Sequence, residues 1–137
     1  MPVTFARVVC VVSFAALMAG CGDDTPTLPT TPTLPSVTES FSGTLNVNGA
    51  ITHSFVSGSF GSVTSTLTAV TPDTAVLGMS LGTWNGISCN IILAADKSAL
   101  NTTVTGVVSS VGNLCVRLYD VGSLTEPTSY EVRVVHP

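Results

Sequence analysis

The chain from position 39 to position 137 alternates apolar and hydroxyl-bearing residues in short runs, with turn residues every eight to twelve positions. No segment keeps the period of an amphipathic helix over three turns. Alternation over a few residues is the pattern of a half-buried β-strand, and several such strands at regular spacing are typical of a sandwich. We therefore expect an all-β domain of about eight antiparallel strands, a β-sandwich, over residues 39–137.

The first part of this domain reads as a hairpin followed by a third strand. Positions 41, 43, 45 and 47 alternate on one face, and the run 50–56 returns after Asn48-Gly49. These two residues favour the positive φ angles of a type I′ turn, so the two runs are expected to pair. In the third strand, 62–70, Val63 and Leu67 lie on one side and threonines on the other.

The remaining strands are expected over 75–82, 87–93, 102–108, 114–119 and 130–134. Gly78 and Gly82 within the first of these indicate a bulge or a close neighbour. The next strand follows a turn at Trp84-Asn85-Gly86. Residues 94–100 are expected to form one helical turn or a loop.

The first twenty residues have a different pattern. Arg7 precedes an apolar run over 8–17, and the small residues Ala19 and Gly20 follow. This is the layout of a secretory signal peptide. The run is about half of the ~20 residues that a transmembrane helix needs. We therefore expect a cleaved signal peptide over 1–20.

The end of this segment, Leu17-Met18-Ala19-Gly20-Cys21, resembles the lipobox of bacterial lipoproteins. In that family the thiol of the cysteine carries diacylglycerol, and its freed amine is usually acylated. The resemblance implies that Cys21 is the lipidated first residue of a mature envelope protein, at the outer rather than the inner membrane. The alternatives are an ordinary secretory peptide cut near Ala19, or a buried helix ending at Gly20, with Cys21 incidental.

Residues 21–38 are expected to form a linker. Pro26, Pro29, Pro32 and Pro35 recur every three residues among threonines. The repeat favours polyproline II, which would hold the domain about 30 to 40 Å from the bilayer. The alternatives are a disordered linker of shorter mean reach and a docking site for a proline-recognising module.

The chain has four cysteines. Cys10 leaves with the signal peptide and Cys21 takes the lipid, so Cys89 and Cys115 remain. The oxidising envelope favours a disulfide between them. The alternatives are two buried thiols or a metal site, although a zinc site would normally need a nearby histidine or a second cysteine pair.

Composition limits the chemistry. The net charge is −4, no basic block is present, and a nucleic-acid partner is therefore not expected. His53 and His136 are the only histidines, and no catalytic motif accompanies them. We expect a monomeric protein that is not an enzyme. The alternative is a small hydrolase that uses His53 as a general base with a turn carboxylate.

Two groups of residues are candidates for binding. Trp84, the only tryptophan, is either a core side chain or a platform that stacks on sugar, and Tyr119 is a second candidate ligand contact. Four acidic residues are expected in turns, where such side chains cap the backbone more often than they bind calcium: Asp73, Asp96, Asp120 and Glu126. A calcium-stabilised domain using Asp73 or Asp120 is the alternative, and no other cofactor is expected.

Four segments resemble the bacterial pre-peptidase C-terminal domain: His53-Ser54-Phe55-Val56, Gly61-Ser62-Val63-Thr64-Ser65-Thr66-Leu67, Gly112 to Asp120, and Tyr130-Glu131-Val132-Arg133-Val134. The resemblance implies a jelly-roll-like sandwich that serves as an accessory or binding module. Some relatives bind calcium through acidic residues of a middle strand, whereas the equivalent run 75–81 has none. We therefore expect a lipid-anchored, non-catalytic envelope lipoprotein whose partner is an envelope protein or a glycan.

Overall fold

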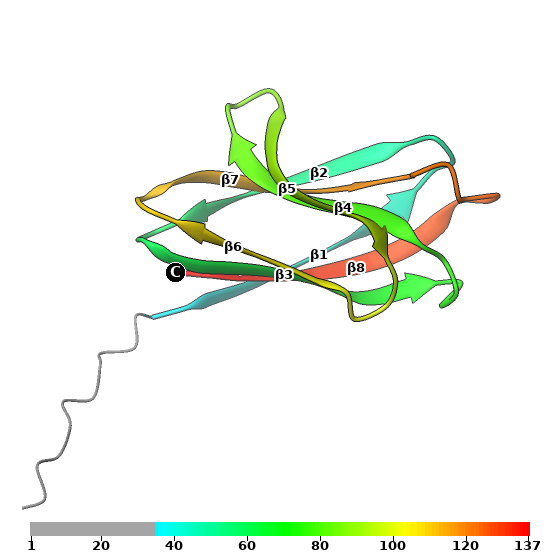
Figure 1. The fold of residues 1–137 in the computed structure, drawn as a ribbon, viewed down its shortest axis with the longest axis horizontal. Helices are drawn as coiled ribbons and strands as arrows, with labels where there is room; N and C mark the ends of the chain where they lie inside the picture. Colours follow the sequence, from blue (N-terminus) through cyan, green and yellow to red (C-terminus); the bar gives the residue numbers. More distant parts are fainter. Residues whose placement is uncertain (1–34) are drawn as a thin grey trace, which may run out of the picture. The chain divides into compact units, whose positions relative to one another are not determined.

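The computed structural model describes residues 35–137, and the regular structure of this part of the chain is β-strand. The expected signal peptide, Cys21 and most of the expected linker lie outside the described residues. Within residues 35–137 no helix could span a membrane. The strands, in chain order, are β1 (Val37–Leu45), β2 (Ala50–Ser57), β3 (Gly61–Thr71), β4 (Leu77–Trp84), β5 (Cys89–Ser98), β6 (Thr103–Val108), β7 (Gly112–Tyr119) and β8 (Thr128–His136) (Figure 1).

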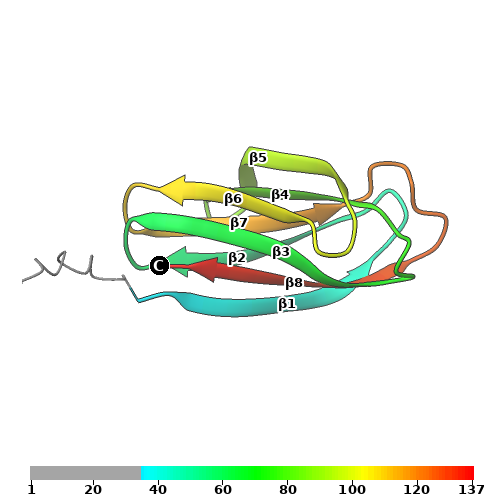
Figure 2. The same ribbon diagram turned by 60° about the horizontal axis from the view of Figure 1, so that its bottom comes forward.

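These eight strands form two four-stranded sheets. Sheet A has the order β1-β8-β3-β6 and sheet B the order β2-β7-β4-β5, and every strand pair is antiparallel. In Figure 1, β2 and β7 lie above β3 and β8, and Figure 2 shows the strands turned by 60°. The expected β-sandwich is confirmed.

The core lies between the two sheets and is formed by alternate positions of the strands. In β3, Val63, Ser65 and Leu67 are buried while the threonines between them are partly exposed. The same alternation places Tyr130, Val132 and Val134 of β8 inward, as expected. The largest fully buried apolar side chains are Leu45, Leu67, Leu77, Met79, Leu118, Val116, Val132 and Val134. Burial of this set is the main term that stabilises the domain.

The outer face of β3 carries hydroxyl groups, as its sequence predicted. Thr64 Oγ1 lies 3.3 Å from Thr105 Oγ1, and Thr66 Oγ1 lies 3.0 Å from Thr103 Oγ1, across the pair with β6. Such cross-strand hydroxyl pairs stabilise a sheet by a few tenths of a kcal/mol to about 1 kcal/mol each. The polar face of sheet A therefore depends on hydroxyls more than on charges.

The expected hairpin of the first two strands is wrong. β1 pairs with β8 and β2 pairs with β7, so the connection at Asn48-Gly49 crosses from one sheet to the other. Of the two turn residues Asn48 and Gly49, only Asn48 has a positive φ, 56°. The Gly49 amide donates to the Asn46 carbonyl at 2.9 Å, so residues 46–49 fit a type II turn. Alternation shows that a segment is a strand with one buried face, but it does not say which strand is the partner.

The expected helical turn or loop over 94–100 is also wrong in its first half. β5 continues to Ser98, pairing Ala95 with Met79 and Ser98 with Leu77. The strand begins at Cys89 rather than at the expected position 87. β5 is the edge of sheet B and is exposed on both faces along most of its length, so alternation is lost there.

The two glycines of β4 mark both a bulge and close neighbours, as expected. The register between β4 and β5 shifts at Leu77/Met79 and again at Leu81/Gly82. A Cβ on Gly82 would lie 2.1 Å from the Asn90 carbonyl oxygen, and one on Gly78 would lie 2.2 Å from the Tyr119 ring. The absence of side chains at Gly78 and Gly82 therefore lets β5 and the Tyr119 ring approach β4 closely.

Candidate binding surface

The disulfide predicted between Cys89 and Cys115 is present, with an S–S distance of 2.04 Å. It links the first residue of β5 to the middle of β7, across the end of β4. Cys115 is fully buried, whereas Cys89 is half-buried. The bridge therefore fixes the base of the β4–β5 hairpin to the centre of sheet B.

The turn of this hairpin, at residues 85–88, is held by the side chain of Asn85. Its Oδ1 accepts the Ile87 amide at 2.9 Å and the Ser88 amide at 2.8 Å. The backbone N–H of Asn85 donates to the Ser88 carbonyl at 3.2 Å. The side-chain nitrogen Nδ2 of Asn85 donates to Ser88 Oγ at 3.1 Å. Asparagine closes such turns because its short amide reaches the following backbone N–H groups.

Trp84 is the last residue of β4 and pairs with Cys89. Trp84 is half-buried and is absent from the buried core cluster, so it is not the core side chain that was one of its two expected roles. Side chains alternate along a strand, so Trp84 lies on the face opposite the buried Leu81. It shares the outer face of sheet B with the disulfide.

An exposed apolar surface extends from the hairpin along β5 to the neighbouring edge of sheet A. The sequence analysis missed it, because it read the isoleucines as members of an ordinary half-buried strand. A signal was present, since residues 77–95 contain no charged side chain. We call this surface the β5 apolar surface; it comprises Ile87 (90% exposed), Ile91 (45%), Ile92 (69%), Leu93 (37%) and Val107 (83%).

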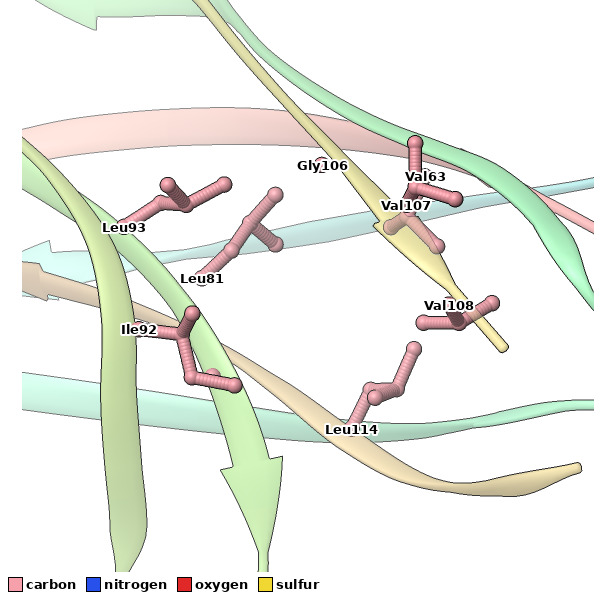
Figure 3. A pocket seen from close by; sticks show the side chains of 9 residues that line it. Val63, Leu81, Ile92, Leu93, Gly106, Val107, Val108 and Leu114 are labelled. Atoms are coloured by element: carbon pink, nitrogen blue, oxygen red, sulfur yellow. The ribbon is translucent and has the colours of Figure 1, made fainter. Parts of the chain in front are cut away.

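A small apolar pocket lies under part of the β5 apolar surface, where the sandwich opens between β5 and β6. Its cavity is about 60 Å³, and Ile92, Leu93 and Val107 line its outer part (Figure 3). Gly106 leaves space for Leu93, whose Cδ1 would lie 2.9 Å from a Cβ at that position. Sites that enclose small molecules usually measure about 300 to 1,000 Å³. This pocket is therefore suited to one or two methyl groups of a partner surface.

Tyr119, the second candidate contact, lies with its ring against Gly78 at the other end of β4 from Trp84. Its hydroxyl donates to Asp96 Oδ1, and the Arg117 guanidinium carbon lies 5.5 Å from the ring centroid. Burial raises the pKa of Tyr119 to about 12, and Asp96 acts in the same direction. The structure therefore does not bring Tyr119 and Trp84 together into one site.

The two tyrosines of the chain are expected to titrate at a pH of about 12 rather than near 10. The folded state favours the neutral phenol, so the stability from this preference is complete below pH 10 and is lost as the pH rises through 12. Ultraviolet absorbance titration measures both groups. Asp96→Asn should lower the pKa of Tyr119, whereas Glu39→Gln, in the other sheet, should not change it. A phenol that titrates near 10 in the folded protein would contradict this expectation.

His53 is a half-buried residue of β2. Its Nε2 lies 2.8 Å from the Tyr130 hydroxyl, and its ring stacks on Phe41 with centroids 4.9 Å apart. Burial lowers the pKa of His53. The partner of His53 is thus a phenol of the opposite sheet, whereas the hydrolase hypothesis paired it with a turn carboxylate.

The second histidine makes a side-chain hydrogen bond that the sequence analysis missed. His136 is buried, and its Nε2 lies 2.9 Å from Glu39 Oε1. The two residues are 97 positions apart but face each other across the β1–β8 edge of sheet A. His136 also packs on Phe55 of sheet B, with ring centroids 5.0 Å apart. The contact between His136 and Phe55 joins the two sheets.

The acidic residues take structural positions. Asp120 Oδ1 accepts the amides of Gly122, Ser123 and Leu124 at 2.8 to 3.1 Å, and Oδ2 accepts the Asn48 amide at 2.8 Å. These bonds lower the pKa of Asp120, the Asn48 bond most. The capping interpretation is confirmed for Asp120, whereas Asp96 lies in β5 and not in a turn.

The other two acidic residues expected in turns lie in connections between strands, Asp73 after the Thr71–Pro72 peptide and Glu126 before β8. In the described part of the chain, no group of three or more His, Cys, Asp or Glu side chains is placed to hold a metal ion.

No protein-family model matches this chain, and a search of curated proteins gives no match in sequence. The structure thus establishes the β-sandwich that the pre-peptidase C-terminal resemblance implied, without identifying a family.

Proposed function

We propose that this chain is a lipid-anchored, non-catalytic lipoprotein of the bacterial cell envelope, which presents its β-sandwich as a binding or accessory module. The N-terminal sequence supports the anchor, since Cys21 follows a signal-peptide pattern and small residues at positions 19 and 20. The proline-rich run before β1 supports a stalk. We place the protein at the outer membrane.

The observation that carries the binding role is the β5 apolar surface. Exposed apolar side chains that stand singly are normal, but a contiguous group of them usually marks an interaction site. Here Ile92, Leu93 and Val107 line one pocket between β5 and β6. Ile87 and Ile91 continue the apolar side chains toward the hairpin turn, no charged residue occurs within 77–95, and the half-buried Trp84 precedes the turn. Apolar side chains of this kind are more stable when a binding partner covers them than when water does.

The disulfide supports the proposed compartment. Disulfides persist in the periplasm and at cell surfaces and are rare in the reducing cytosol. The bond between Cys89 and Cys115 therefore agrees with export, and it leaves Cys21 free to carry lipid.

Replacement of Cys21 by serine tests the anchor. In a bacterial host, the wild-type protein should fractionate with membranes, and mass analysis should find an N-terminal peptide that begins at Cys21 and carries diacylglycerol and an acyl chain. Cys21→Ser should lose this modification completely. Cys10→Ser, in the expected signal peptide, is the matched control and should change nothing. An unmodified mature N-terminus near Ala19 would show an ordinary secreted protein and refute the anchor.

A further inference from the structure

We infer that the β4–β5 hairpin is a membrane-contact site, at which Trp84 and Ile87 beside and in the turn, and Ile92 farther along β5, enter the interfacial region of a zwitterionic lipid bilayer. The inference rests on the proposed function, because the lipid on Cys21 is what would bring the domain to a bilayer. It adds a second contact, made by this chain's own side chains, and it names the lipid surface as the partner of the β5 apolar surface.

The hairpin has the side chains that such a contact needs. Ile87, at its tip, is 90% exposed, and Ile92 is 69% exposed. Trp84 is half-buried at the base of the turn. Tryptophan is enriched at the level of lipid headgroups, whereas isoleucine favours the hydrocarbon beneath. In Figure 1 this hairpin projects from the body of the sandwich, so its tip can approach a flat surface.

Three backbone donors of the turn are already paired within it. The backbone N–H groups of Asn85, Ile87 and Ser88 all donate to acceptors inside the turn, at 2.8 to 3.2 Å. An unpaired N–H group would oppose entry into a bilayer, because lipid cannot replace its bond to water. Without the Asn85 side chain, two of these donors would need water. The turn is therefore suited to a medium of low polarity.

The disulfide restricts the motion of the hairpin. Cys89 follows the turn directly and is bonded to Cys115 in the centre of sheet B. A contact element that is held in its bound shape loses less conformational entropy when it binds. The bridge thus keeps Ile87 at the outermost point of the hairpin.

The charge of the domain indicates the kind of lipid. Residues 35–137 contain six acidic and three cationic side chains, and none of them lies within 77–95. Anionic lipids attract basic segments and repel an acidic protein. An uncharged hairpin on a negatively charged domain therefore fits a zwitterionic surface such as phosphatidylcholine or phosphatidylethanolamine.

The segment between Cys21 and β1 is long enough for the hairpin to reach the membrane. Fifteen residues separate Cys21 from the start of β1, and a chain of this length reaches at most about 50 Å. The nine-residue strand β1 is about 30 Å long at 3.3 Å per residue. We take the tether as the disordered linker, the alternative to polyproline II, so the hairpin can turn toward the leaflet that holds the anchor.

The test uses the acylated full chain and phosphatidylcholine vesicles whose acyl chains carry bromine, a quencher of tryptophan fluorescence. Trp84 is the only tryptophan, so its emission reports the hairpin alone. We expect a blue shift and quenching of Trp84 in the wild type. The double variant Ile87→Ser, Ile92→Ser should lose the quenching while the protein still floats with the vesicles. Phe60→Ser, an equally drastic change at an exposed residue outside the hairpin, should keep it.

Flotation and quenching are scored separately, so the anchor and the hairpin can fail independently. A protein that floats without quenching of Trp84 overturns the hairpin contact and leaves the anchor intact. Quenching in a protein found to lack lipid supports the hairpin and overturns the anchor. Equal quenching in the isoleucine variant, quenching only with anionic lipid, or an isoleucine-dependent dimer without quenching would each overturn the inference. Near-ultraviolet circular dichroism checks that the variants remain folded.

Discussion

Reduction of the Cys89–Cys115 disulfide is expected to lower the free energy of unfolding of the domain by about 3.5 kcal/mol. The two cysteines are 26 positions apart, so the bond closes a long loop in the unfolded chain and restricts its conformations. For a domain of this size, a loss of 1 kcal/mol lowers the Tm by about 4 to 8 °C. We therefore expect the Tm to fall by roughly 15 to 25 °C in reductant, as measured by calorimetry.

The double variant Cys89→Ala, Cys115→Ala is the control for this experiment. It should melt near the temperature of the reduced wild type, and reductant should not change its Tm. Alanine is suitable because Cys115 is fully buried, where a serine hydroxyl would lack a partner. An equal Tm for the oxidised and reduced wild type would show that the bridge does not stabilise this domain.

Leu118→Ala is expected to lower the free energy of unfolding by about 2 to 5 kcal/mol. Leu118 is fully buried in β7, a central strand of sheet B, where it pairs with Ile51 on one side and Met79 on the other. The backbones of these neighbours are held by sheet pairing, so they cannot close the cavity that the substitution leaves. The total free energy of unfolding of a small domain is about 5 to 15 kcal/mol, so the substitution would remove a large part of the domain's stability.

Leu100→Ala provides the matched comparison, because the side-chain atoms removed are the same and Leu100 is 41% exposed in the connection before β6. We expect a change within about 0.5 kcal/mol. Urea unfolding of both variants at equal m-values separates the two effects. If the two substitutions lowered the free energy of unfolding equally, the assignment of Leu118 in β7 to the core would be incorrect.

The strands and their buried faces were predictable, because alternation is a local property. The runs around Val63 and Leu67, and around Val132 and Val134, each show their buried side within a few residues. The edge strand β5 was harder: solvent covers both of its faces, so residues 94–98 carry no alternation and were not predicted as strand.

The candidate site was predictable in part. The disulfide followed from counting cysteines, and Trp84 was recognised as an unusual residue at a turn. Its exposure was not predictable, because that depends on which face of β4 meets the opposite sheet. Ile87 looked like an ordinary strand residue in the sequence, whereas in the structure it lies at the tip of a projecting turn.

The sequence by itself determined that residues 39–137 form antiparallel strands, most of them with one buried face, and it favoured a turn cap at Asp120 and a bridge between Cys89 and Cys115. These features follow from periodicity over a few residues, from short-range hydrogen bonds, and from the small number of cysteines. Only the tertiary structure decided which strands pair and which apolar side chains stay exposed. Such choices depend on contacts between distant positions, such as Glu39 with His136, 97 residues apart. They are set by how two sheets pack as a whole, so no short segment contains them.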